Sequence, residues 1–222
     1  MCGRFTLRTP QTILIKRFGD GIPDDLRPRY NIAPTQTILA IRQPEFKREI
    51  LEFRWGLIPF WAKEAKIGYS LINARADTVA TKPSFRAAFK KRRCLILADG
   101  YYEWQKLDAK NKQPYHIHMK DNRTFTFAGL WESWTDPESK KEIESCTIVT
   151  TDANEATAKI HDRMPVILDE AARETWLDSK IQDGAKLEPL LAPYAEKDLV
   201  FDPISTYVNS PKNQGEKCLE PA

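Results

Sequence analysis

The apolar residues of this chain fall into many short runs, and most of these runs have the spacing of β-strands. Segments 37–42 (TILAIR) and 49–54 (EILEFR) flank a polar turn and predict two neighbouring strands. Segment 93–99 (RCLILAD) is nearly all apolar and stops before Gly100, which is typical of a buried strand. Further strands are predicted over 3–8, 101–104, 114–119, 124–130, 145–151 and 165–168, with 114–119 and 124–130 joined as a hairpin around Asp121-Asn122.

A smaller part of the chain has helical character. Asp169 precedes a helix predicted over 169–178, where an aspartate can cap the first turn and Glu170 and Glu174 suit the early turns. Other helices are predicted over 10–19, 83–90, 153–160 and 187–195. From about residue 209 the sequence is polar with Pro and Gly, and we expect a loop or a frayed tail there.

These elements predict an α+β fold: a single domain whose curved antiparallel β-sheets form a barrel-like core with peripheral helices. The 222 residues, 41% of them hydrophobic, suffice for one core. We place the domain at residues 1–215 and a tail at 216–222. No apolar run approaches the roughly 20 residues that span a bilayer, and the start MCGRFTLR lacks the apolar region of a signal peptide. We therefore expect a cytoplasmic monomer that makes no membrane contact.

The four cysteines form no CxxC pair, and the three histidines lack partners at metal-ligand spacing, so neither a metal nor another cofactor is expected. Cys94 and Cys146 lie in predicted strands and are expected in the core, whereas Cys218 falls in the tail. His116 and His118 share a strand face and are interpreted as ordinary surface or half-buried residues.

Charge is distributed unevenly along the chain. Residues 1–100 carry 19 Lys and Arg against 9 Asp and Glu, and residues 101–222 carry 15 against 22. A basic half fits an anionic partner such as a nucleic-acid backbone. If the two halves mix in one compact fold, however, the asymmetry disappears in space, and charge alone favours neither outcome. Arg92 and Arg93 either contact phosphate or are solvated.

Cys2 is the first candidate for chemistry. A small second residue permits removal of the initiator Met, which leaves an amine and a thiol on one residue. Their unperturbed pKa values, about 7.7–8.0 and about 8.5, make both partly nucleophilic near neutral pH. An aldehyde reacts with such a pair by forming an imine, which the thiol closes to a thiazolidine, and proximity makes the closure fast. Position alone would fit a chance cysteine at a frayed end.

Five further motifs accompany the Cys2-Gly3-Arg4 start: 31–35 (NIAPT), 54–59 (RWGLIP), 73–77 (NARAD), 98–104 (ADGYYEW) and 161–165 (HDRMP). Together, in this order and spacing, they closely resemble the SOS response-associated peptidase family, from residue 2 to about residue 215. The family includes bacterial and animal proteins that shield abasic sites in DNA. The resemblance implies that Cys2 links to the ring-opened deoxyribose aldehyde of an abasic site in single-stranded DNA. We expect such a protein to be nucleoid-associated when it is bound to DNA.

The resemblance also implies roles for matched positions. The catalytic positions are Cys2, Asn73, Glu103 and His161, with Glu103 and His161 as an acid–base pair. The DNA-binding positions are Arg4, Asn31, Pro34, Trp61, Arg75 and Arg163, and Asn209 with 212–214 resembles a segment near the DNA. A histidine suits proton transfer near neutral pH, and a partly buried Glu103 is expected to have a raised pKa. The less favoured alternative is that Glu103 pairs with a nearby lysine or arginine.

The loop 59–61 offers Phe60 and Trp61 as stacking faces for unpaired bases. Its alternative is core packing, which we assign to Trp55. Ala62 stands where some relatives carry a second aromatic residue.

Three functions are open at this stage. The first is a covalent shield of abasic single-stranded DNA, with a possible lyase activity. The second is a cysteine-type autopeptidase that removes Met1 with Cys2, Glu103 and His161. The third is a module that binds single-stranded DNA without a covalent bond and needs Arg4, Arg75 and Trp61 but not Cys2.

Overall fold

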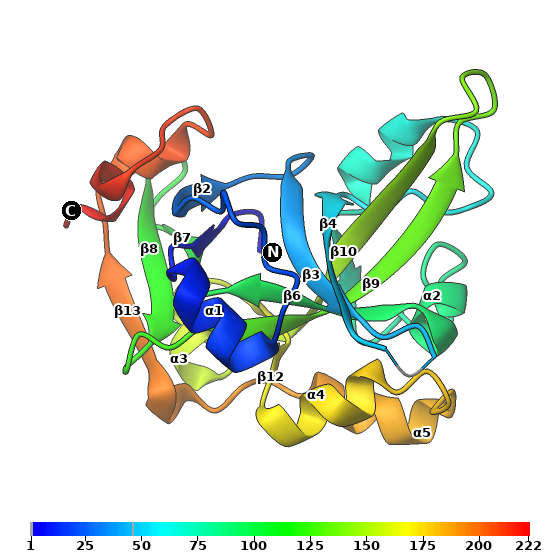
Figure 1. Cartoon of the computed structure of the whole chain (residues 1–222). Coiled ribbons are helices and arrows are strands. Elements are labelled where there is room, and N and C mark those ends of the chain that lie inside the picture. Colours follow the sequence, from blue (N-terminus) through cyan, green and yellow to red (C-terminus); the bar gives the residue numbers. More distant parts are fainter. Residues whose placement is uncertain (1, 46) are drawn as a thin grey trace.

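Five strands close into a barrel at the centre of the molecule (Figure 1). The computed structural model describes residues 2–45 and 47–222. The barrel strands, in spatial order, are β4 (Glu49–Trp55), β3 (Thr37–Arg42), β6 (Arg93–Ala98), β9 (Phe125–Thr135) and β10 (Glu142–Asp152). β10 pairs with both β9 and β4, which closes the ring and leaves these strands without a free edge. The expected α+β barrel with peripheral helices is therefore confirmed.

Short strands extend the barrel at one side. β5 (Asn73–Arg75) and β11 (Arg163–Pro165) pair with β10, and β12 (Ile167–Leu168) pairs with β9. The β4–β10 and β5–β10 pairings are parallel, so the expectation of wholly antiparallel sheets is wrong for this part. A parallel neighbour of β10 becomes possible because long stretches of chain separate β4 and β5 from it.

A second sheet of five antiparallel strands lies beside the barrel. Its order is β13 (Leu199–Pro203), β8 (Lys112–Met119), β7 (Gly100–Lys106), β1 (Phe5–Leu7) and β2 (Arg29–Ile32). The chain passes from the barrel to this sheet at Asp99, between β6 and β7. The predicted strand segments 93–99 and 101–104 therefore belong to different sheets.

The helices are short and lie outside the sheets. They are α1 (Gln11–Phe18), α2 (Arg86–Lys91), α3 (Glu155–Ala158), α4 (Glu170–Leu177) and α5 (Gly184–Leu187), with 3₁₀ turns η1 (Ala65–Ser70), η2 (Glu188–Leu191), η3 (Glu196–Asp198), η4 (Thr206–Asn209) and η5 (Glu216–Leu219). Asp169 caps α4 as predicted, since its side chain accepts a bond from Ala172 N at 2.8 Å. The helix predicted over 187–195 is instead divided between α5 and η2.

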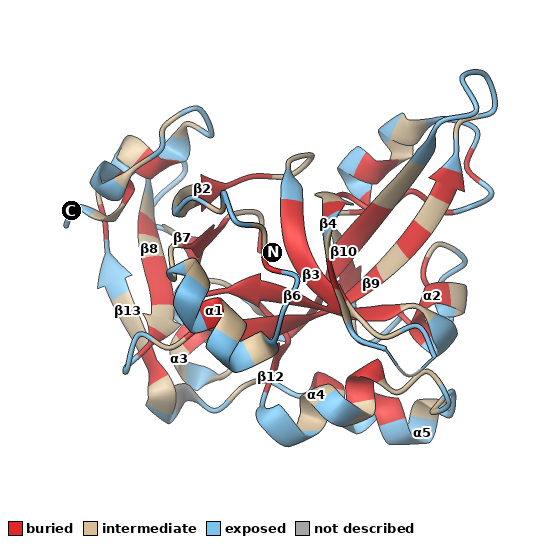
Figure 2. Cartoon of the chain, viewed as in Figure 1, coloured by how far each residue is buried: buried red, intermediate tan, exposed pale blue. Residues whose placement is uncertain are grey.

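Burial follows the barrel, with the helices buried mainly on their inner sides (Figure 2). All six residues of β6 are buried, including Arg93. The Arg93 guanidinium donates to carbonyls of Phe89, Lys90, Trp176, Asp178 and Ile181, at and just beyond the ends of α2 and α4. These carbonyls have no partner within their helices, which explains a buried cation. Burial lowers the Arg93 pKa to about 10. Arg93 is thus a structural residue and neither a phosphate contact nor a solvated one.

The predicted hairpin of 114–119 with 124–130 is wrong. β8 pairs with β7 and β13, whereas β9 pairs with β6, β10 and β12. The chain does turn at 119–122, where Asn122 N donates to Met119 O and Asn122 has a φ of 56°. That turn carries the chain from the second sheet to the barrel, and β8 instead forms a hairpin with β7, and β9 with β10.

The C-terminal residues pack against the second sheet instead of fraying. Ser205 N donates to Glu220 O at 2.8 Å, and Ile204 forms an isolated bridge with Pro221. Cys218 in η5 is fully buried, so it is not the incidental tail residue that the sequence suggested. The apolar side chains that make this packing are spaced through a polar segment, so the sequence pattern did not indicate it.

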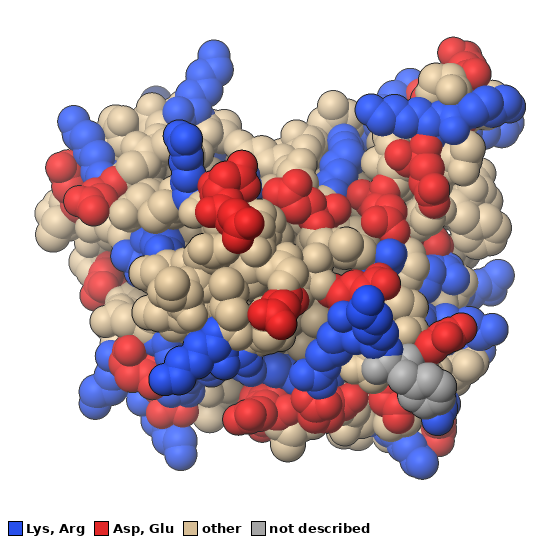
Figure 3. Space-filling view, in the orientation of Figure 1, with Lys and Arg blue, Asp and Glu red and all other residues tan. Residues whose placement is uncertain are grey.

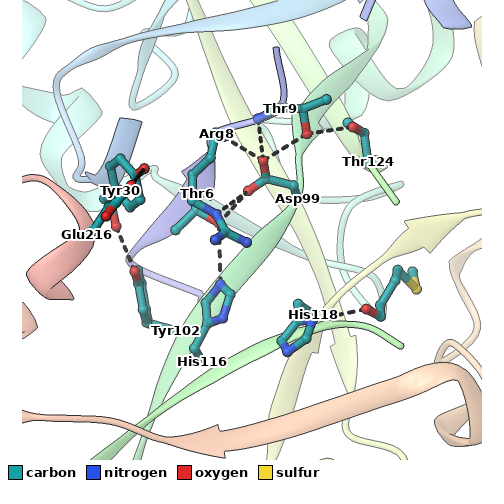
Figure 4. A network of polar contacts seen from close by, with 11 residues as sticks. Thr6, Arg8, Thr9, Tyr30, Asp99, Tyr102, His116, His118, Thr124 and Glu216 are labelled. Atoms are coloured by element: carbon teal, nitrogen blue, oxygen red, sulfur yellow. Dashed lines mark hydrogen bonds and ion pairs between the residues drawn. The ribbon is translucent and has the colours of Figure 1, made fainter. Parts of the chain in front are cut away.

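Asp99 holds the N-terminal strand in place (Figure 4). Its Oδ1 accepts a bond from Thr6 Oγ1 at 2.6 Å. Its Oδ2 accepts bonds from the backbone N–H groups of Arg8 and Thr9, at 2.5 and 2.7 Å, and from Thr9 Oγ1 at 2.9 Å. Because Asp99 sits where the chain leaves the barrel, these bonds fix β1 and the start of α1 to both sheets.

Replacing Asp99 with Ala should lower the free energy of unfolding by about 2–4 kcal/mol, because two backbone donors and two hydroxyls lose a buried charged acceptor. Urea unfolding followed by fluorescence measures this. The matched control is Asp121→Ala, an exposed aspartate whose loss should cost less than about 0.5 kcal/mol. Equal stabilities for the two variants would contradict the anchoring role of Asp99.

Candidate functional site

Cys2 lies between the two sheets, just before β1, and its side chain is fully buried. Asn73 Nδ2 donates to Cys2 O at 2.9 Å. Asn73 begins β5 at the side of the barrel, whereas Cys2 precedes β1 of the second sheet. The bond therefore joins the segment that leads into the second sheet to a short strand at the side of the barrel. Asn73 Oδ1 is also buried and accepts no hydrogen bond within the described residues.

Glu103 enters the same region from β7. Alternation along this strand directs Tyr101 and Glu103 to one face and Tyr102 and Trp104 to the other. Burial raises the pKa of the Glu103 carboxyl to about 7, as the sequence led us to expect. A carboxyl with this pKa can both accept and release a proton near neutral pH.

Burial also raises the pKa of the Cys2 thiol, and the charge of Glu103 raises it further. The sequence-based expectation that this thiol is partly ionised near neutral pH is therefore wrong for the folded chain. The fully buried sulfur is held as S–H, with Arg4 O 3.9 Å from it. Any reaction of Cys2 must remove the thiol proton at a late step or transfer it directly.

His161 follows α3 and is half-buried. Burial lowers the pKa of its imidazole, so the neutral form predominates at neutral pH. His161 Nδ1 lies 2.8 Å from Asp162 Oδ1 and accepts a bond from Arg163 N at 3.1 Å. This segment is held to the second sheet by Gln105 of β7, whose Nε2 donates to Lys159 O at 2.9 Å. The ring is thus fixed near the end of the strand that carries Glu103.

Arg75 and Arg163 come from the two short strands that flank β10, and one carboxylate contacts both. Arg75 Nε and Nη2 lie 3.1 and 2.5 Å from Asp77 Oδ1 and Oδ2, and Arg163 Nη2 lies 3.5 Å from the same Oδ2. Arg163 Nη1 also lies 3.4 Å from Asp152 Oδ1. Arg75 holds the pKa of Asp77 at about 2, so Asp77 is ionised at any working pH.

The side chains of Arg4 and Asn31 are held by hydrogen bonds within the fold. Arg4 Nη1 donates to Asn31 Oδ1 at 2.7 Å and to Val208 O at 3.0 Å. Asn31 Nδ2 donates to carbonyls of Val208, Ser210 and Asn213. These two side chains tie the C-terminal segment to β1 and β2, and the Asn31 amide has no donor left over.

The two remaining candidates lie on loops. Pro34 is half-buried in the turn between β2 and β3. Trp61 is 48% exposed and Phe60 61% exposed, on the turn after β4. This turn is anchored, because Trp134 Nε1 donates to Ala62 O at 2.7 Å. Trp55 is fully buried, which confirms its assignment to the core.

The sequence matches the model of the SOS response-associated peptidase family over residues 1–211. The chain belongs to this family. YoqW of Bacillus subtilis strain 168, named an abasic site processing protein, is 45% identical over 223 aligned residues that cover 99% of each chain. HMCES of Gallus gallus, with the same description, is 34% identical and is matched over 88% of this chain and 66% of its own length. A crystal structure of a Bacteroides thetaiotaomicron protein has a TM-score of 0.89 at 30% identity and covers 100% of both chains.

Membership of the family does not by itself identify every residue near the site, and two groups were missed from the sequence. Tyr101 is buried beside Cys2 and Glu103, and burial raises the pKa of its hydroxyl. An open pocket of about 450 Å³ is lined by Arg4, Trp104, Lys110, Lys112 and Asn209. The β7–β8 register, which pairs Trp104 with Pro114 and Lys106 with Lys112, would have revealed the lysines, but the wrong hairpin concealed it.

One group of side chains has the composition of a metal site. Among the described residues, His116, His118 and Asp202 offer ligand atoms within 4.8 Å of one another. The two imidazole rings are stacked, with centroids 5.0 Å apart and an interplanar angle of 19°. His116 Nε2 lies 3.4 Å from Thr6 Oγ1 and His118 Nε2 lies 2.9 Å from Asp202 Oδ2, so both nitrogens have partners within the protein. His116 is buried over Gly100, where a Cβ would lie 2.1 Å from its Nε2.

On the face in Figure 3, basic and acidic side chains are interspersed, so this face carries no continuous basic stripe. Among the described residues, no helix is long and apolar enough to cross a membrane.

Replacing Glu103 with Gln should change how stability depends on pH. The folded-state pKa, about 7, lies above the ordinary value of 4.5, so ionising this carboxyl costs the fold stability as pH rises between these values. The variant should gain on the wild type across this range, by roughly 3 kcal/mol at pH 8 at 1.36 kcal/mol per pKa unit.

Denaturant unfolding between pH 4 and pH 8 tests this, with Glu138→Gln, an exposed hairpin position, as the control. A pH-independent difference in stability between Glu103→Gln and the wild type would show that folding does not raise the pKa of Glu103.

Proposed function

We propose that this protein captures abasic sites in single-stranded DNA as a covalent thiazolidine on Cys2, once Met1 has been removed. The observation that carries the proposal is the position of Cys2: its carbonyl is held by Asn73, and it is buried beside a carboxyl with a pKa of about 7. The relatives named as abasic site processing proteins support DNA as the substrate.

The reaction begins by opening the deoxyribose hemiacetal. Neutral His161 accepts the proton of the C1 hydroxyl, and the imidazolium returns a proton to the ring oxygen as the C1–O bond breaks. The Cys2 amine then adds to C1, and the Glu103 carboxylate takes the proton that the nitrogen loses. Glu103 gives that proton to the alkoxide oxygen, which becomes the hydroxyl of a carbinolamine. The second proton of the nitrogen reaches this hydroxyl through the same carboxyl, so both amine protons leave with the oxygen as water and an imine remains.

The thiol closes the ring. Its sulfur adds to C1 of the imine while its proton passes to the nitrogen, and the product is a thiazolidine, with one water released overall. The raised pKa of the thiol explains this order, because the amine is the stronger nucleophile while the sulfur remains protonated. Placing both nucleophiles on one residue makes the closure intramolecular.

The surrounding cations and aromatic side chains would hold the strand. Arg75 and Arg163 suit the phosphates beside the lesion, and the pocket lined by Arg4 and Lys112 suits the strand beyond it. Phe60 and Trp61 offer exposed faces to unpaired bases. Backbone contact and stacking together would give affinity without sequence preference.

Related activities would use the same groups. The imine stage can be hydrolysed, or can eliminate the 3′ phosphate as a lyase does, if the thiol does not close the ring. Glu103 and His161 could also assist attack of the Cys2 thiol on the Met1 carbonyl, which would make Met1 removal self-catalysed. Intact mass of protein produced without methionine aminopeptidase distinguishes self-removal from removal by another enzyme.

Mixing the protein with an abasic single strand should give an adduct that survives denaturation and whose mass is the sum of both components less one water. Cys2→Ala should abolish it, because both the thiol and ring closure are lost. Cys2→Ser and Cys2→Ala both keep the α-amine and should give only an imine, which borohydride traps. Intact-mass spectrometry reads all three, and a full yield of stable adduct from Cys2→Ala would refute the proposal.

Replacing Asn73 with Ala should slow adduct formation roughly 100-fold, because Cys2 loses the bond that positions it. Binding of an intact strand should change little. Single-turnover cross-linking and anisotropy measure the two quantities, with Asn111→Ala in the β7–β8 turn as the control. Equal loss of rate in both variants would show that Asn73 does not position the nucleophile.

A further inference from the structure

Arg75 and Arg163, two of the arginines expected to bind phosphate, already contact carboxylates. Arg75 uses Nε and Nη2, the edge that grips a phosphate or carboxylate in a bidentate manner, to hold Asp77. Arg163 is divided between Asp77 and Asp152. Asp162 also lies near enough for its charge to act on Arg75. Two cations therefore face three anions at the place where a phosphate should bind.

Exposure distinguishes the members of this cluster. The Arg163 side chain is only 11% exposed and is fixed, whereas Arg75 and Asp77 are 53% and 49% exposed. An exposed pair of this kind is weakly held in water. Arg75 can therefore exchange Asp77 for another anion at little cost, while Arg163 stays in place. Asp77 alone bridges the two arginines among the contacts of the described residues.

We propose that Asp77 is a specificity-determining residue that competes with DNA phosphate for the guanidinium edge of Arg75. This inference rests on the proposed function. An intact strand gains only phosphate and stacking contacts. The free energy needed to displace Asp77 is therefore a large share of the binding free energy of such a strand. An abasic strand gains a covalent bond as well and is captured in spite of the competition. Asp77 thus weakens residence on undamaged DNA more than capture of the lesion.

Counterion release provides a signature of this exchange. A phosphate that contacts a cation releases bound salt, which gives a slope of about −0.7 in log K against log salt per contact on single strands. In the wild type, the displaced Asp77 carboxylate takes up a cation from solution and cancels most of that release. Without the Asp77 charge the cancellation disappears, so the slope becomes steeper by about 0.7.

The test compares Asp77→Asn with the parent, both in the Cys2→Ala background so that binding stays non-covalent. Asparagine keeps the size of the side chain and one acceptor oxygen but removes the charge. The variant should bind a fluorescent oligothymidylate roughly three- to tenfold more tightly at low salt, with the steeper slope. In the Cys2-containing protein, Asp77→Asn should make adduct formation more sensitive to an intact competitor strand.

Asp152→Asn is the matched control. It removes the same charge from an 83% exposed side chain that contacts Arg163 but not Arg75. A smaller gain in affinity and an unchanged slope are expected from it. Equal effects of the two variants, or no tightening by Asp77→Asn, would overturn the exchange model. If Asp77→Asn tightens binding as expected but the Cys2 protein forms no adduct, the proposed function fails while Asp77 remains a competitor for phosphate.

Discussion

The placement of Cys2 depends on holding the beginning of the chain rigidly between two sheets. The first residues of a domain ordinarily fray, since few contacts offset the entropy of ordering them. Here Asp99 fixes β1 from the point where the barrel ends, and Asn73 holds the Cys2 carbonyl from β5. The closed barrel supplies the rigidity, because β5 lies along β10, the strand that completes the ring. A terminal residue thereby acquires the fixed geometry of an interior one.

The burial that fixes Cys2 also sets the acid–base properties of the site. Removing water raises the pKa values of Glu103 and of the Cys2 thiol and lowers that of His161. All three groups are thereby shifted toward their neutral forms, which suits the proposed condensation, since it expels water and builds no lasting charge. A solvent-exposed aminothiol would carry more thiolate but would leave the proposed imine open to hydrolysis. Burial in this fold thus lowers the ionised fraction of the thiol, but it fixes the position of Cys2 and excludes water from it.

The sequence predicted elements better than it predicted their partners. Alternating residues in 114–119 and 124–130 correctly indicated two strands, because alternation reports which faces are buried. It says nothing about which strand lies alongside, so the adjacent pair was joined into a hairpin although each strand belongs to a different sheet. The predictions for Arg93 and Cys218 were wrong for a related reason. A charged residue becomes internal only because two helix ends converge on it, and a polar segment becomes ordered only because the second sheet receives it.

The catalytic candidates and the DNA-binding candidates differ in how far sequence motifs could locate them. Cys2, Asn73 and Glu103 meet because short strands hold them, and the motifs mark those strands. The arginines are long and their guanidinium groups go where acceptors are, so a motif fixes their origin but not their contacts. Arg4 ends on the C-terminal segment, and Arg75 ends on Asp77. A strand entering this site would thus meet cations that are already paired, and its phosphates would bind by exchanging partners. Exchange of partners would lower the non-covalent affinity for every strand alike, and under the proposed function only a strand with an abasic site would regain that loss through a covalent bond.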